Sequence, residues 1–282
     1  MSWLTLTLLS VIIASVASIL QRVLMKDDKS NPYSYAIIFH LLLGVLVLVF
    51  GLIRGVDFSL FSGNVYMLLL ASALWGACQV FLFKALQLLE ASEVTVISDT
   101  RVIFTIIASV IFLGEAFTSW NILGAMLILT ATLLVVDIKK GFEFNKGVWY
   151  TLAMAFFAGL AIVADSANVQ QYDVLAYSTF SNFLSGLFVL AFYPKSLRQW
   201  THFIQPSFLV KMVPLAVFSA TQGILYLLAL TYGGNTAQVG TIRQASVIVT
   251  VLLAVILLNE RGKLWQKFVA AILVTAGVFL LS

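Results

Sequence analysis

The feature that most constrains this chain is a succession of apolar runs, each about 20 residues long, that extends almost from one end to the other. A helix of about this length crosses the hydrocarbon core of a bilayer. Hydrophobic residues make up 61% of the chain and charged residues only 10%, outside the usual range of soluble domains. The sequence therefore predicts an all-α membrane protein with no room for a soluble domain.

The apolar runs are separated by short polar, glycine-containing or proline-containing breaks, which gives about ten transmembrane helices. The first run has neither a positive flank before it nor an obvious cleavage site, so we expect it to be a span that stays in the mature protein. The predicted spans are 3–24, 33–53, 64–89, 92–113, 119–137, 147–169, 175–193, 208–231, 236–258 and 264–281.

The chain contains an internal repeat, which appears when it is aligned with itself at an offset of 145 residues. Matches among valine, isoleucine and alanine are weak evidence, because apolar helices share these letters by chance. The matches of Glu115 with Glu260 and of Trp120 with Trp265 occur in the same register and are more specific. The sequence therefore predicts two homologous halves.

The predicted repeats cover residues 1–140 and 141–282, with five spans in each. Because five is an odd number, the second copy must enter the membrane in the opposite sense from the first. Inverted repeats of this kind can exchange conformations and so give alternating access to a site near the bilayer midplane.

Two related motifs end the fourth span of each repeat: VIFLGE at Val110–Glu115 and VILLNE at Val255–Glu260. Each motif precedes a final helix that contains small residues, such as Gly124 and Gly277. With these motifs the chain resembles the EamA-type members of the drug/metabolite transporter superfamily over nearly its whole length. The resemblance implies ten helices in two repeats, with spans 1, 3, 4, 6, 8 and 9 around a central cavity, and substrates such as amino acids and other small metabolites, often exported.

The basic residues indicate an orientation in the membrane. The loops after spans 1, 5, 7 and 9 each hold three Lys or Arg residues, whereas the opposite side has essentially only Arg54. The positive-inside rule then places both termini outside the cytoplasm. Eukaryotic relatives imply cytosolic termini instead, so the orientation stays open. We expect the cytoplasmic membrane of a prokaryotic cell, and the scattered basic residues predict no nucleic-acid partner.

Four ionisable residues fall inside the predicted spans: Asp99 and Arg101 in span 4, Asp165 in span 6 and Arg243 in span 9. A charge at the centre of a spanning helix costs about 2.5–3.5 kcal/mol and usually faces a cavity or a partner. Asp99 and Arg101 are about 200° apart on a regular helix, so we expect them to face different neighbours.

Our hypothesis is that Arg101 or Arg243 binds a carboxylate or another anionic group of the substrate. Asp99 or Asp165 would then bind an amine or carry a coupling proton. The alternative is that these residues form interhelical salt bridges. Uncharged side chains on spans 3, 8 and 9 complete the candidate substrate site, as alternatives to helix packing: they are Trp75, Gln79, Gln222, Tyr226 and Gln244.

No phosphate-binding glycine-rich loop is present in the sequence, which favours a secondary transporter over an ATP-driven pump. The predicted cargo is a small polar metabolite, either amino-acid-like or an organic anion, with export and proton coupling left open. A channel or a lipid-moving protein is the alternative, and a multi-pass enzyme is a further one. We expect no cofactor, and we expect Glu115 and Glu260 to have structural roles at helix ends that water can reach.

Overall fold

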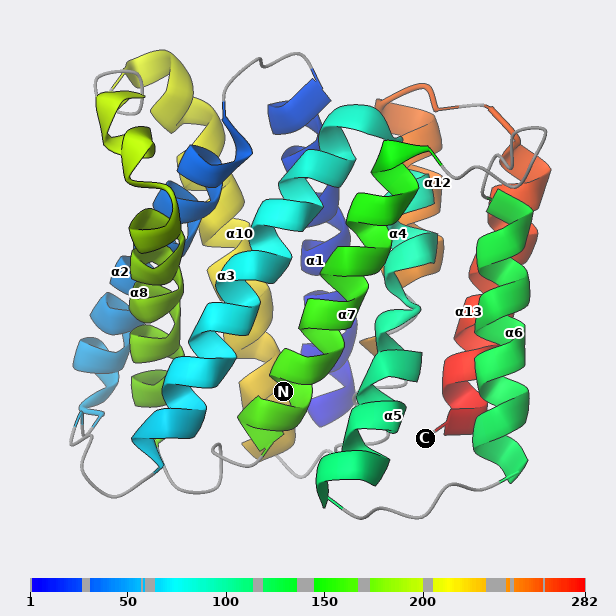
Figure 1. The fold of residues 1–282 in the computed structure, drawn as a ribbon, viewed down its shortest axis with the longest axis horizontal. Coiled ribbons are helices and arrows are strands. Elements are labelled where there is room, and N and C mark those ends of the chain that lie inside the picture. Colours follow the sequence, from blue (N-terminus) through cyan, green and yellow to red (C-terminus); the bar gives the residue numbers. More distant parts are fainter. Residues whose placement is uncertain are drawn as a thin grey trace.

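The structure is a computed structural model, and it is a bundle of helices that run side by side (Figure 1). Both ends of the chain lie at the lower edge of the bundle in this view. The structure describes residues 2–26, 31–56, 58, 64–113, 119–135, 145–166, 173–199, 205–231, 242–243, 246–260 and 262–281.

The helices follow the apolar runs closely. They are α1 (Trp3–Lys26), α2 (Pro32–Arg54), α3 (Val65–Leu88), α4 (Ala91–Ser98), α5 (Arg101–Leu113), α6 (Ser119–Val135), α7 (Lys146–Ser166), α8 (Val174–Phe192), the 3₁₀ helix η1 (Pro194–Gln199), α10 (Pro206–Thr231), α12 (Ser246–Leu257) and α13 (Leu264–Leu281).

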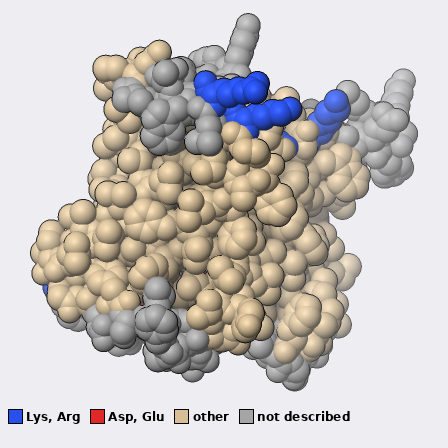
Figure 2. Space-filling view, turned by 60° about the vertical axis from the view of Figure 1, so that its left-hand side comes forward, with Lys and Arg blue, Asp and Glu red and all other residues tan. Residues whose placement is uncertain are grey.

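Seven segments of the described chain are long and apolar enough to cross a membrane, with α4 and α5 together forming one of them. Shorter apolar helices in α6, α12 and α13 fall in three further predicted spans. Figure 2 shows most of the visible Lys and Arg side chains gathered at one end of the molecule, above a broad surface that has only a small basic patch at its edge. The chain is an integral multi-pass membrane protein.

Local sequence signals explain where α2 begins and ends. The Asn31 side chain accepts a hydrogen bond from the backbone N–H of Tyr33, and Pro32 occupies the first helical position, where its missing N–H costs nothing. Gly55 ends the helix in the left-handed conformation, with φ of 69°. These caps satisfy backbone groups that the bilayer could not satisfy.

The fourth span is interrupted, whereas the sequence predicted one continuous helix over 92–113. Helix α4 ends at Ser98 and α5 begins at Arg101, with a turn at Asp99 and Thr100. Around this turn the backbone bonds switch to the shorter i to i−3 pattern, as in Thr100 N to Ile97 O (3.1 Å) and Val102 N to Asp99 O (3.1 Å). The interruption therefore leaves the backbone hydrogen-bonded while it changes the direction of the side chains.

The helix contacts follow a two-fold pattern that relates the two repeats. Helix α1 of the first repeat packs on α10 of the second. Their counterparts at the repeat offset, α7 for α1 and α3 for α10, also pack on each other. In the same way, the contact of α2 with α10 corresponds to that of α8 with α3. The pairs α2–α8 and α6–α13 each join equivalent helices. This exchange of partners supports the predicted repeat.

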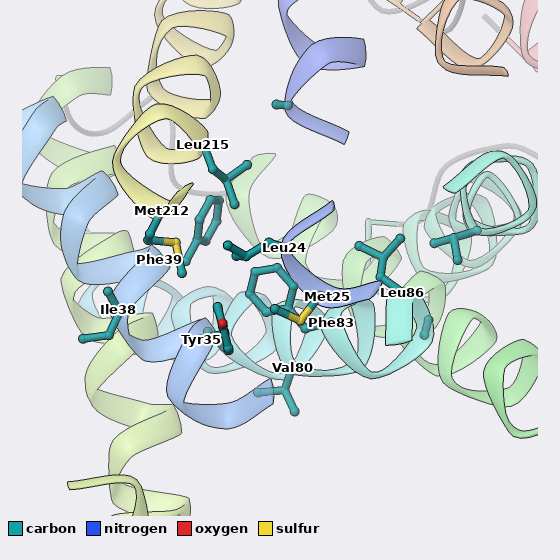
Figure 3. Close-up of a cluster of buried hydrophobic side chains, with 14 of the residues drawn as sticks. Leu24, Met25, Tyr35, Ile38, Phe39, Val80, Phe83, Leu86, Met212 and Leu215 are labelled. Atoms are coloured by element: carbon teal, nitrogen blue, oxygen red, sulfur yellow. The ribbon is translucent and has the colours of Figure 1, made fainter. Parts of the chain in front are cut away.

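The largest apolar core lies where α1, α2, α3 and α10 cross (Figure 3). Tyr35 of α2 and Phe83 of α3 are fully buried there, with an edge-to-face contact between their rings at 6.1 Å. Met25 of α1 and Met212 of α10 fill the space beside them. This core joins helices of both repeats at the upper end of the bundle.

Glycine permits a close crossing of α5 and α7. A Cβ atom on Gly159 would lie 2.8 Å from the carbonyl oxygen of Arg101 and 2.9 Å from the backbone nitrogen of Thr105. Both are backbone atoms, so neither can move aside as a flexible side chain would. In contrast, a Cβ on Gly223 would meet none of the described atoms within 4 Å.

These two glycines make a matched pair for mutation. We expect Gly159→Ala to lower the melting temperature in detergent, because the added methyl group must push α5 and α7 apart. Gly223→Ala should leave it unchanged or raise it, since alanine favours helix. Differential scanning fluorimetry of both purified variants measures this, and equal melting temperatures would contradict the close crossing.

The N-terminus of α4 is held by Glu260, which lies between α12 and α13 in the second repeat. Its carboxylate accepts hydrogen bonds from the backbone N–H groups of Ala91 (3.1 Å) and Ser92 (3.3 Å) and from the Ser92 hydroxyl (2.9 Å). The Arg22 side chain of α1 is 3.7 Å away. Glu260 thus has the predicted structural role, but the expectation that water reaches it was wrong, because it is only 6% exposed.

A second ion pair strengthens the same junction. Lys267 of α13, which is 1% exposed, donates to the carboxylate of Glu90, the residue before α4. Arg22 also donates to the carbonyl oxygen of Leu86 at the end of α3. Charged groups of both repeats therefore surround the start of α4. Glu115, the counterpart of Glu260, lies outside the described residues.

We expect Glu260→Ala to destabilise the protein by about 3–5 kcal/mol, because it removes three hydrogen bonds and leaves the Arg22 guanidinium buried without this carboxylate. Glu260→Gln should cost less, since the amide oxygen still accepts a hydrogen bond. Thermal unfolding in detergent micelles measures both effects, with Lys195→Ala on the exposed part of η1 as the control. A melting temperature of Glu260→Ala equal to that of the control would show that the junction does not hold α4.

Candidate functional site

A basic cluster, defined as Arg243, Gln222 and Tyr226, lies between α10 and the segment before α12. The Arg243 Nη2 atom donates to the Gln222 side-chain oxygen at 2.6 Å, and its guanidinium carbon lies 4.3 Å from the centre of the Tyr226 ring. Among the described residues no ion pair joins Arg243 to a carboxylate. An amide and an aromatic face thus position this cation without neutralising it.

Asp99 and Arg101 form an ion pair at the interruption of the fourth span, with 3.1 Å between Asp99 Oδ1 and Arg101 Nη2. The prediction that they face different neighbours was therefore wrong. It assumed a regular helix, and the turn between α4 and α5 brings the two side chains together. Asp99 is buried, whereas the Arg101 side chain is 37% exposed. The guanidinium can therefore meet a ligand while it stays paired.

Gln79 of α3, next to Cys78, is a buried candidate residue. The Gln79 side-chain nitrogen has no hydrogen-bond partner among the described atoms, so it can donate to a ligand.

An acidic cluster, defined as Asp165, Trp75 and Tyr177, joins α7, α3 and α8. Asp165 lies in the last turn of α7, where its carboxylate accepts from Trp75 Nε1 at 2.7 Å and from the Tyr177 hydroxyl at 2.5 Å. The sequence analysis placed Asp165 and Trp75 in the candidate substrate site without joining them, and the structure joins the two by a hydrogen bond.

The sequence analysis missed Tyr177. It belongs to a buried polar stripe on α8 that continues with Ser181 and Ser185 at intervals of four residues. This spacing was the available signal. Gln244, the remaining candidate, lies outside the described residues, so its relation to the basic cluster stays a prediction.

Seven described segments that are long and apolar enough to cross a membrane define a polytopic membrane protein. The family model described as "EamA-like transporter family" matches residues 1–137 and again residues 145–282. The chain belongs to the EamA-like transporter family, and the two matches confirm the two repeats.

The fold is shared with a known structure. Among the matching solved structures is one described as "Crystal structure of protein", which is 17% identical to this chain and gives a TM-score of 0.63. The match covers 99% of this chain and 95% of the other. At this identity the similarity extends to the fold alone. A search of curated proteins finds no match.

The exposure of Arg101 can be tested with a thiol reagent, because Cys78 is the only cysteine and is buried. We expect a charged methanethiosulfonate reagent to label Arg101→Cys in membranes and to leave the wild-type protein unlabelled, since the reagent reaches only thiols in contact with water. Ala131→Cys on α6 is the control, because Ala131 is completely buried. Equal labelling of the two variants would contradict a water-accessible Arg101.

Proposed function

We propose that this protein is a secondary transporter that moves a small polar metabolite by alternating access, in the cytoplasmic membrane of a prokaryotic cell. Its two five-helix repeats, 1–140 and 141–282, would be inverted and give ten spans. The exchange of helix contacts between the repeats supports this architecture, because a symmetric scaffold can adopt two related packings. The interrupted fourth span supports it as well, since broken helices commonly form the binding sites of carriers.

The observation that carries the substrate assignment is the state of Arg243. Arg243 is half-buried and its guanidinium is hydrogen-bonded to Gln222, yet no described carboxylate pairs with it. A cation in that setting is costly unless an anion joins it. The planar guanidinium can donate two parallel hydrogen bonds to a carboxylate. The cargo therefore carries a carboxylate or a similar anionic group.

Arg101 would form the second contact with the same anion. It belongs to the other repeat, and its side chain is partly exposed. An anion held by both guanidinium groups would offset their like charges. Gln79 and Tyr226 add a hydrogen-bond donor and a flat wall, so an amino-acid-like metabolite or an organic anion fits best.

The competing classes differ in how they use such a site. A channel needs a continuous polar path, whereas the described polar groups form separate clusters that are each joined to neighbouring helices by hydrogen bonds. A lipid-moving protein would present its polar groups toward the bilayer. The partial burial of Arg243 between α10 and α12 favours a carrier over both alternatives.

The test is uptake of labelled amino acids and organic anions by proteoliposomes. Loss of a charge-assisted hydrogen bond costs about 1.5–3 kcal/mol, so we expect Arg243→Gln to raise the half-saturation concentration about 10- to 100-fold. Arg243→Lys should fall between this variant and the wild type, because lysine keeps the charge but loses the planar fork. Arg54→Gln, at the exposed end of α2, serves as the control. An unchanged half-saturation concentration in Arg243→Gln would contradict the assignment of Arg243 to the substrate site.

A further inference from the structure

The half-buried Asp165 carboxylate differs from those of Glu260, Asp99 and Glu90, each of which has a basic side chain beside it. Glu260 has Arg22 beside it, Asp99 pairs with Arg101, and Glu90 pairs with Lys267. Asp165 is joined only to the neutral donors Trp75 and Tyr177. Within the described part of the chain, its negative charge therefore has no countercharge.

In the described part of the chain, no charged side chain on the neighbouring helices supplies a countercharge to the Asp165 carboxyl. Helix α7 packs against α3, α4 and α5, and α8 contributes Tyr177. None of the titratable or charged side chains on α3, α4 and α5 forms a described hydrogen bond or ion pair with the Asp165 carboxyl. These side chains are Tyr66, Cys78, Lys84, Glu93 and Arg101, and Asp99 in the turn between α4 and α5 has no such contact either.

The two donors are not equivalent. Trp75 Nε1 can only donate, so the Asp165 oxygen that it contacts, Oδ2, must remain an acceptor. The Tyr177 hydroxyl can donate or accept, and it lies 2.5 Å from the other oxygen, Oδ1. The same positions of the heavy atoms therefore suit a charged carboxylate and a carboxylic acid protonated on Oδ1.

We propose that the acidic cluster is the proton-binding site that couples transport to a proton gradient, with Asp165 Oδ1 as the atom that gains and loses the proton. The inference rests on the proposed carrier function and adds its coupling ion. A proton from water binds Oδ1, the new O–H donates to the Tyr177 oxygen, and the tyrosine hydroxyl turns toward another acceptor. Release of the proton restores the original direction of the hydrogen bond, and no other bond changes.

The position of the cluster suits proton exchange with water and communication with the rest of the protein. Asp165 is the penultimate residue of α7, and Tyr177 is the fourth residue of α8, so both lie near one membrane boundary. Trp75 lies further along α3, next to Gly76, whose Cβ position is 2.9 Å from the carbonyl oxygen of Ser185 on α8. A change of charge at Asp165 therefore acts on three tightly packed helices.

The protonation itself can be measured without knowing the cargo. Difference infrared spectra of the protein in lipid, recorded across a pH titration, report the carbonyl stretch of protonated carboxyl groups. We expect a titrating band that is absent from Asp165→Asn and present in Asp173→Asn, a control whose amide still caps α8. Identical bands in all three proteins would overturn the proposal.

Flux measurements test the coupling. With the labelled carboxylate that wild-type proteoliposomes exchange fastest, we expect a pH gradient to drive accumulation by the wild type and by Asp173→Asn. Asp165→Asn should lose at least nine-tenths of this accumulation and keep exchange without a gradient, because its permanently neutral amide cannot carry a proton.

The remaining outcomes separate the two proposals. Gradient-driven accumulation by Asp165→Asn at the wild-type level would overturn the proton site, as would a wild type that exchanges substrate without responding to the gradient, and either result leaves the carrier standing. Loss of exchange in folded Asp165→Asn would also overturn it and make Asp165 a contact for the substrate. Absence of exchange in the wild type, for every compound, would contradict the carrier function itself.

Discussion

The hydrogen bonds from the start of α4 to Glu260 are the interaction on which the centre of this protein depends. Helix α4 has only eight residues, too few to be stable alone, and the span breaks immediately after it. Its first N–H groups have no acceptor in lipid, so a buried carboxylate must supply one. Because that carboxylate comes from the second repeat, the position of Asp99 and Arg101 depends on contact between the two halves.

The scaffold is nearly symmetric, whereas the groups that it carries are not. At the repeat offset, Arg101 corresponds to Ser246 and Arg243 corresponds to Ser98. The backbone carbonyl oxygens of Arg101 and Ser246 each lie against the first helix of the opposite repeat. A Cβ atom on Gly159 of α7 would be 2.8 Å from the first oxygen, and the Ser15 hydroxyl of α1 donates to the second. In the proposed carrier, the shared backbone would allow exchange between two packings, while the different side chains would bind an asymmetric molecule.

The sequence was sufficient for an all-helical membrane protein and for the repeat, because these follow from the lengths of the apolar runs and from the matched Glu and Trp positions. The break at Asp99 and Thr100 could not be predicted, since it contains neither glycine nor proline. The ion pair of Asp99 with Arg101 was missed for the same reason. Burial of Glu260 and the contact of Tyr177 with Asp165 depend on neighbours distant in the sequence, which only the packed bundle brings together.

Counterflow tests the central claim, that the protein is a carrier with a saturable site, most directly. Proteoliposomes loaded with a high concentration of unlabelled amino acids or organic anions are diluted into a trace of the same labelled compounds. A carrier is expected to accumulate label inside transiently above its equilibrium level for at least one compound. The reason is that each inward step with label is followed by an outward step with the abundant unlabelled compound. Label that only equilibrates, at a rate independent of the internal compound, would indicate a channel and contradict the account.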